Sequence, residues 1–132
     1  MSGKDRYLID TNILIYFLEG EKQALALFEK ILDDEIYISL INKIEVLSFP
    51  DISKKEEKSI RMFLSSFITL EIDNTIAEEA IRIRKNYKLK LPDALICATS
   101  IIKDTILVSR NEKDFLKVKG LKFLNPYQAE MK

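Results

Sequence analysis

The sequence of 132 residues contains no histidine, one cysteine and only three glycines. Without histidine, the chain cannot form a Ser-His-Asp or Cys-His nucleophile or a histidine-bound zinc site. The single Cys97 excludes an internal disulfide and a cysteine metal cage. The glycines form neither of the two common phosphate-binding motifs, G-x-x-x-x-G-K and G-x-G-x-x-G. Any chemistry must therefore use carboxylates, amides, hydroxyls, lysine or arginine.

Long apolar runs and an excess of one charge are also missing. No apolar stretch reaches the roughly 18 residues of a membrane span, and residues 1–6 do not read as a signal peptide, so we expect a cytoplasmic protein with no membrane contact. Since 21 basic residues balance 21 acidic ones, any nucleic-acid binding must come from a local patch or a metal. The length predicts one domain, residues 1–132, with a tail at 125–132 that we expect to fray.

Short apolar runs alternate with segments of helical periodicity. Strands are expected at Tyr7–Asp10, Ile36–Ile38, Ile68–Ile72, Thr105–Val108 and Leu121–Leu124. Helices are expected at Ile13–Leu18, Glu21–Leu32, Ser39–Leu47, Thr75–Lys88, Pro92–Lys103 and Asn111–Leu116. A further helix is expected to begin after Ser53 as its N-cap, and Asp73 is expected to cap the helix at Thr75–Lys88. The alternation predicts an α/β domain with a mainly parallel sheet of four to five strands between helices.

Four acids are expected at one edge of that sheet, outside the carboxyl ends of the strands. Asp10 ends the first strand, and Glu45 lies about two turns into the helix after the second. Asp93 opens a helix, and Asp114 follows the fourth strand. Because clustered carboxylates repel one another, they favour a divalent cation, and oxygen ligands alone favour Mg²⁺ or Mn²⁺. A metal held this way can activate water for phosphodiester hydrolysis.

At these residues the chain resembles the PIN domain family of metal-dependent ribonucleases, and most of all the single-domain VapC toxins of toxin–antitoxin pairs. Four segments in chain order carry the resemblance, which covers essentially the whole chain: Leu8–Asn12, Ser39–Leu47, Leu91–Ala98 and Leu107–Phe115. The resemblance implies a three-layer α/β/α PIN-like domain. It implies that the catalytic and metal-binding residues are Asp10, Glu45, Asp93 and Asp114, with auxiliary polar roles for Asn12, Ser109 and Asn111. Ser109 stands where the family usually has threonine, but it retains the hydroxyl.

The function implied is that of an endoribonuclease dependent on Mg²⁺ or Mn²⁺, the toxin of a type II pair, which hydrolyses RNA with a metal-activated water. The implied partners are RNA, an antitoxin protein and a second copy of the chain. Two alternatives stay open: an RNA-processing PIN nuclease without an antitoxin, and a non-catalytic binding module of the same fold. A phospho-aspartate enzyme is a third, although Asp10-Thr11-Asn12 lacks the Asp-x-Asp of the phosphatase type.

Each acid also has a purely structural interpretation. Asp10 can be only the N-cap of the next helix, and Glu45 can be a solvated helix position. Asp93 has the favourable charge of a helix start. Asp114 competes with the nearby Glu112 for the fourth place, and we favour Asp114 because Phe115 anchors the segment.

Two further sets of residues have open roles. A basic run without an intervening acid leads to Asp93, and it is either a solvated face or a rim for RNA phosphates: Arg82, Arg84, Lys85, Lys88 and Lys90, with Arg110 and Lys43 as further candidates. An apolar set is either core or a patch for a partner: Phe17, Ile60, Phe63 and Phe67. Cys97 lies among apolar residues of a helix and is expected to be core.

Overall fold

The computed structural model describes residues 4–127 and contains one sheet of five strands. The strands are β1 (Arg6–Ile9), β2 (Glu35–Ser39), β3 (Ile68–Leu70), β4 (Ile106–Val108) and β5 (Lys122–Leu124). Their order in the sheet is β3-β2-β1-β4-β5, and every neighbouring pair is parallel. The predicted parallel sheet is confirmed, and β1 is its central strand.

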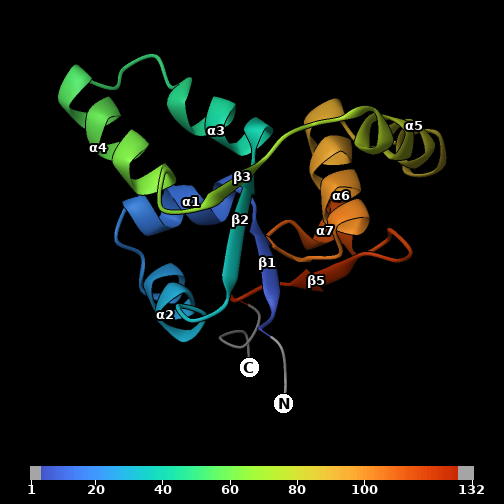
Figure 1. Ribbon diagram of the computed structural model, residues 1–132, viewed down its shortest axis with the longest axis horizontal. Coiled ribbons are helices and arrows are strands. Elements are labelled where there is room, and N and C mark those ends of the chain that lie inside the picture. The colour runs from blue at the N-terminus through green and yellow to red at the C-terminus, as the bar shows by residue number, and fades with distance from the viewer. Residues whose placement is uncertain (1–3, 128–132) are drawn as a thin grey trace.

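Helices cover both faces of this sheet. Over the described residues they are α1 (Thr11–Leu18), α2 (Lys22–Lys30), α3 (Leu40–Leu47), α4 (Lys54–Leu64), α5 (Asn74–Tyr87), α6 (Leu91–Lys103) and α7 (Glu112–Phe115). Figure 1 shows α1–α4 on one side of the strands and α5–α7 on the other. The predicted three-layer α/β/α architecture is therefore confirmed. Within residues 4–127, no helix has the length and apolar character needed to span a membrane.

Alternating side chains of β1 divide the core into two layers. Leu8 packs with α5 and α6, whereas Ile9 packs with the α1–α4 layer, and both side chains are fully buried. A strand with successive side chains on opposite faces must be apolar throughout when helices cover both faces. The apolar run that starts at Tyr7 is explained by this position in the middle of the sheet.

Side-chain caps start the helices where the sequence predicts them. Ser39 and Ser53 each accept a hydrogen bond from a backbone amide of the following turn, and each is part of a reciprocal capping box. Asp73 accepts from the amide of Ile76 at 2.9 Å. The Ser39 cap fixes where β2 ends and α3 begins, which is one edge of the candidate site.

The apolar residues with an open role pack against the core. They are half-buried against the α1–α4 layer: Phe17, Ile60, Phe63 and Phe67. The rings of Phe17 and Phe63 stack with centroids 4.9 Å apart, and Phe63 meets Phe67 edge-on at 5.0 Å. Cys97 is fully buried, and burial raises the pKa of its thiol to about 12. Its predicted role as a core residue is confirmed.

The first residues of the expected frayed tail make specific contacts. The Asn125 side chain donates to Glu112 Oε2 at 2.9 Å and accepts from the Tyr127 amide at 2.9 Å. Tyr127 is buried. The rest of that tail, 128–132, lies outside the described residues.

The two-sided burial of β1 predicts a large effect of truncating one of its side chains. We expect Leu8→Ala to lower the free energy of unfolding by about 2–5 kcal/mol, because it leaves a cavity against α5 and α6. Urea denaturation followed by circular dichroism measures this change. The matched control is Leu32→Ala, because Leu32 is 73% exposed, and it should change stability by less than about 0.5 kcal/mol. Similar losses for the two variants would contradict the assigned core.

Candidate active site

Asp10 is the first residue after β1 and stands between the ends of β2 and β4. Its side chain is 7% exposed. Oδ1 accepts from the Thr11 amide at 2.9 Å, and Oδ2 accepts from the Ser109 hydroxyl at 2.8 Å. The first bond makes Asp10 the N-cap of α1, and the second ties it to the end of β4. Capping and a place in the site therefore occur together.

The surroundings of Asp10 disfavour its charge. Burial raises its pKa from 3.8 to about 6, against the two hydrogen bonds, which lower it. The negative charges of Asp93 and Glu45 raise it further. Asp10 is thus a buried acid, with neighbours of its own sign.

Asp93 lies in the first turn of α6 and is half-buried. Its pKa is also raised, first by burial and then by the charges of Asp114 and Glu45, whereas Lys90 lowers it. The four predicted acids therefore lie within electrostatic reach of one another at the carboxyl ends of the strands, although they come from four separate parts of the chain.

Glu45 and Asp114 are each held by one polar neighbour. Glu45 is exposed on α3, and its Oε1 accepts from the Thr11 hydroxyl at 2.5 Å. Asp114 Oδ2 accepts from the Asn111 side chain at 3.1 Å. The competing Glu112 instead accepts from Asn125 and so belongs to the contacts of the C-terminal segment. This difference favours Asp114 as the fourth acid of the site.

The three auxiliary residues meet at the hydroxyl of Ser109, which is fully buried. That oxygen donates to Asp10 and accepts from the Asn12 side chain at 3.3 Å and from the Asn111 amide at 3.0 Å. Asn12 Oδ1 accepts in turn from the Arg110 amide at 3.4 Å. Ser109 therefore joins the loop after β4 to the start of α1.

Two polar residues of the site were not among the predicted ones. Asn42 is fully buried; its Oδ1 accepts from the Ser39 amide at 2.7 Å, and its Nδ2 donates to Thr11 Oγ1 at 3.1 Å. Thr11 then donates to Glu45. The Ser39-x-x-Asn42 spacing of a capping box is a signal that could have identified Asn42. Nothing in the sequence pattern joins it to Thr11, 31 positions earlier.

The donor set suits a hard divalent cation, because it consists of carboxylate oxygens with hydroxyl and amide oxygens beside them. The geometry is more open than a closed metal site. Within residues 4–127, no three acidic side chains converge closely enough to hold one ion. Glu45 and Asp114 are each turned toward their own hydrogen-bond partner instead. Any shared cation would have to draw further carboxylates toward Asp10.

The predicted basic rim is only partly free. Arg82 forms an ion pair with Glu79, and Arg84 Nε donates to the Leu89 carbonyl at 3.3 Å, so both serve α5 and its end. The other members of the rim are exposed: Lys85, Lys88 and Lys90. Lys43, the further candidate, is half-buried on α3.

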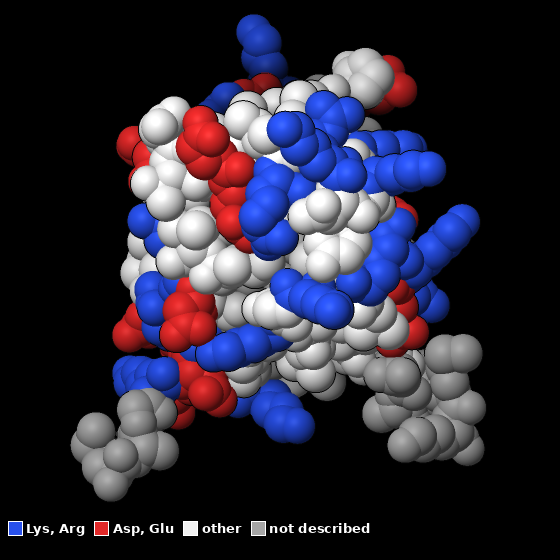
Figure 2. All heavy atoms as spheres, turned by 90° about the vertical axis from the view of Figure 1, so that its right-hand side faces the viewer, with Lys and Arg blue, Asp and Glu red and all other residues white. Residues whose placement is uncertain are grey.

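Charge is unevenly divided between the two halves of this neutral chain. Residues 74–127 carry eleven Lys and Arg against six Asp and Glu, whereas residues 4–73 carry nine against fourteen. Figure 2 shows Lys and Arg side chains gathered on the side of the molecule that carries α5–α7. The basic half of the chain also contains Asp93 and Asp114.

Arg110 is held by aromatic rings next to this site. Its guanidinium carbon lies 4.3 Å from the ring centre of Tyr127 and 5.5 Å from that of Tyr16. Because Arg110 directly follows Ser109, the C-terminal segment helps to place a cation beside the acids.

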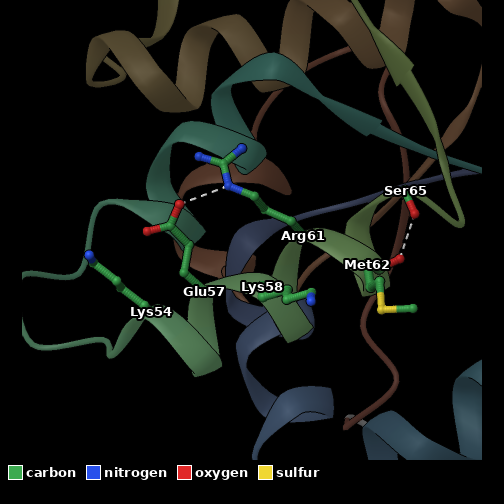
Figure 3. Close-up of a pocket in the computed structure, with 6 residues that line it drawn as sticks. All are labelled: Lys54, Glu57, Lys58, Arg61, Met62 and Ser65. Carbon is green, nitrogen blue, oxygen red and sulfur yellow. Dashed lines mark hydrogen bonds and ion pairs between the residues drawn. The ribbon is translucent and has the colours of Figure 1, made fainter.

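Two hollows of the surface lie away from the four acids. One of about 630 Å³ follows the exposed side of α4, where Arg61 pairs with Glu57 at 2.8 Å (Figure 3). Another of about 640 Å³ lies between α2, the start of β1 and the C-terminal segment. None of the four acids lines either hollow.

The raised pKa of Asp10 predicts how stability depends on pH. The folded metal-free protein binds this proton more tightly than the unfolded chain, so stability falls as pH rises from about 2 to 7, by about 3 kcal/mol from this group. Asp10→Asn removes that charge but retains only one of the two hydrogen bonds, a loss of about 1 kcal/mol. In EDTA, we expect the variant to be about 2 kcal/mol more stable than the native protein at pH 7 and less stable at pH 4.

Chemical denaturation at several pH values measures this crossover. The control is Asp51→Asn, because Asp51 is exposed in a turn, and its stability should follow that of the native protein. A lower stability of Asp10→Asn at every pH would mean that Asp10 is a structural cap and not a strained acid.

The comparisons with known proteins agree with this geometry. Residues 7–121 match the PIN domain. The chain is 31% identical to ribonuclease VapC2 of Methanocaldococcus jannaschii, with 92% of this chain and 94% of the relative aligned. It is 28% identical to ribonuclease VapC19 of Mycobacterium tuberculosis over 82% of this chain and 90% of that protein.

A solved structure has the same architecture. A chain of a toxin–antitoxin complex from Klebsiella pneumoniae superimposes with a TM-score of 0.82 and 39% identity, covering 92% of this chain and 98% of that one. The match to the PIN domain extends from β1 to the residue before β5 and includes all four acids. The chain therefore belongs to the PIN domain family.

Proposed function

We propose that this protein is a metal-dependent endoribonuclease and the toxin of a toxin–antitoxin pair. The observation that carries the proposal is the buried Asp10, with a raised pKa, facing the charges of Glu45 and Asp93. Such a group is unfavourable in a metal-free fold and useful where a cation binds. Two relatives of similar length bear the name ribonuclease, which supports RNA as the substrate.

The metal would be Mg²⁺ or Mn²⁺, held by oxygens of Asp10, Glu45, Asp93 and Asp114. When bound, such an ion lowers the pKa of a coordinated water and neutralises charge on a phosphoryl oxygen. The chain's own polar residues orient these acids. Ser109 and the Thr11 amide hold the Asp10 carboxylate, and Asn111 holds that of Asp114.

The exposed lysines Lys85, Lys88 and Lys90 would bind RNA phosphates and lead the strand to Asp93. Arg110, in the loop after β4, would contribute a further phosphate contact. The positive half of the chain supports this assignment, since a neutral protein needs a local patch to attract a polyanion. Arg82 and Arg84 are assigned a supporting role, because they already have partners within α5 and its end.

An antitoxin protein would be the main partner. The Klebsiella pneumoniae relative was solved as a toxin–antitoxin complex, which supports this assignment. A homodimer and a cytoplasmic location are also proposed, on the family resemblance. An RNA-processing nuclease without an antitoxin would use the same acids, and a small partner gene beside its own gene would distinguish the two.

A non-catalytic binding module is the second candidate. It is favoured by one observation: within residues 4–127, no three acids converge on a single point. Cleavage assays separate the two functions, because a binding module would retain RNA without cutting it.

The proposed chemistry predicts that Asp93 is required for cleavage. Purified protein with Mn²⁺ should produce discrete new 5′ ends in total cellular RNA, and EDTA should abolish them. Asp93→Asn should lower the rate by about 100-fold or more, because metal binding supplies several kcal/mol of transition-state stabilisation. Asp51→Asn, which removes an exposed acid of a distant turn, is the control. Full metal-dependent cleavage by Asp93→Asn would refute the scheme.

The proposed rim predicts a position-dependent effect of neutralising lysines. Converting Lys85, Lys88 and Lys90 together to Gln should weaken RNA binding, with Asp93→Asn as the background so that the RNA stays intact. The slope of log affinity against log salt concentration should become less steep by about 2, because three phosphate contacts are lost and each contributes about 0.7 with a single strand.

The matched control has the same change in charge on another helix: Lys54, Lys55 and Lys58 of α4, all converted to Gln. Fluorescence anisotropy across a salt series gives both slopes. Equal effects of the two triple variants would mean that total charge, and not the proposed rim, governs RNA binding.

A further inference from the structure

Glu45 is the acid of the site that the fold restrains least. It is exposed on α3, and the charges of Asp10, Asp93 and Glu45 repel one another. A long exposed side chain under repulsion is expected to turn into solvent, where its charge is hydrated. In this structure it does not, because Oε1 accepts from the Thr11 hydroxyl at 2.5 Å.

The Thr11 hydroxyl has one proton, so its direction decides whether it can hold Glu45. Asn42 Nδ2 lies 3.1 Å from that oxygen, and an amide nitrogen only donates. Thr11 therefore accepts from Asn42, and its own proton is available for the carboxylate. If an acceptor replaced that nitrogen, the Thr11 hydroxyl could donate to it instead of to Glu45.

The orientation of the Asn42 amide is itself fixed. Its Oδ1 accepts from the Ser39 backbone amide at 2.7 Å, and the side chain is fully buried. Turning the amide over would set two donors against each other at Ser39 and would present Oδ1 to Thr11 as a competing acceptor. The bonds thus run in one direction, from the end of β2 through Asn42 and Thr11 to Glu45.

We propose that Asn42 is a positioning residue that, by directing the Thr11 hydroxyl proton at Glu45, holds this acid beside Asp10 for a divalent cation. The inference rests on the proposed function, since it assumes that the acids bind a metal. The second oxygen of Glu45 stays free for that ion, because only Oε1 is used by Thr11. Asn42 does not touch the substrate or the metal and acts through Thr11.

Mn²⁺ binding without RNA, measured by calorimetry, tests this role. Asn42→Leu and Thr11→Val should each weaken binding by about tenfold, the scale expected when a partner of a metal ligand is lost. The double variant should also bind Mn²⁺ only about tenfold more weakly than the native protein, because both changes break the same chain of hydrogen bonds. Thr11→Ser restores the hydroxyl and should bind within about twofold of the native protein.

A control separates positioning from helix capping. Glu56 occupies the same place in the capping box of α4 that Asn42 occupies in α3, so Glu56→Ala should leave Mn²⁺ affinity unchanged. If Asn42→Leu fails to fold, as judged by circular dichroism, Asn42→Asp takes its place, because it retains an acceptor for the Ser39 amide and loses the amide donor to Thr11.

The possible results have distinct meanings. Additive losses near 100-fold in the double variant, or unchanged affinity in Thr11→Val, would overturn the positioning role and leave the proposed function intact. An absence of Mn²⁺ binding by the native protein would overturn the metal-dependent function itself and the positioning role with it.

Discussion

The buried carboxylate of Asp10 is the constraint around which the site is arranged. It ends the central strand β1, where the side chain is 7% exposed and its pKa rises to about 6. Hydrogen bonds from Thr11 and Ser109 favour the charged form, and burial opposes it more strongly. A fold selected for stability alone would place a neutral cap such as serine or asparagine there. The strain makes sense if a positive charge supplied from outside completes the site.

The sheet order explains how distant residues reach this acid. With β1 in the middle and β2 and β4 on either side, the carboxyl ends of three strands meet at one edge. Asp10 and Ser109 are 99 positions apart yet joined by a 2.8 Å hydrogen bond. The same arrangement puts the acidic half of the chain on one side of the sheet and the basic half, with α5–α7, on the other. The Lys and Arg side chains on the side of α5–α7 can attract a polyanion to this otherwise neutral chain.

Periodicity and capping rules predicted the helices and strands, because these rules depend only on residues that are close together in the sequence. The same rules, with the position of each acid after a strand or at a helix start, predicted which acids lie at one edge. Contacts between elements were beyond this reasoning. The bond from Asn42 to Thr11 depends on how α3 packs near α1. The sequence already favoured Asp114 over Glu112 through Phe115, but the bond that occupies Glu112 comes from Asn125 of the C-terminal segment and could not be predicted.

The account stands on a divalent cation that neutralises Asp10. The most direct measurement is a crystal structure of the protein with Mn²⁺, with anomalous diffraction data collected to locate the ion. We expect one strong anomalous peak, from an Mn²⁺ ion coordinated by Asp10 and by at least one of Glu45, Asp93 and Asp114. The second carboxylate should lie closer to Asp10 than in the metal-free fold. Full occupancy of Mn²⁺ elsewhere, or an Asp10 that stays without an ion at saturating Mn²⁺, would contradict the account.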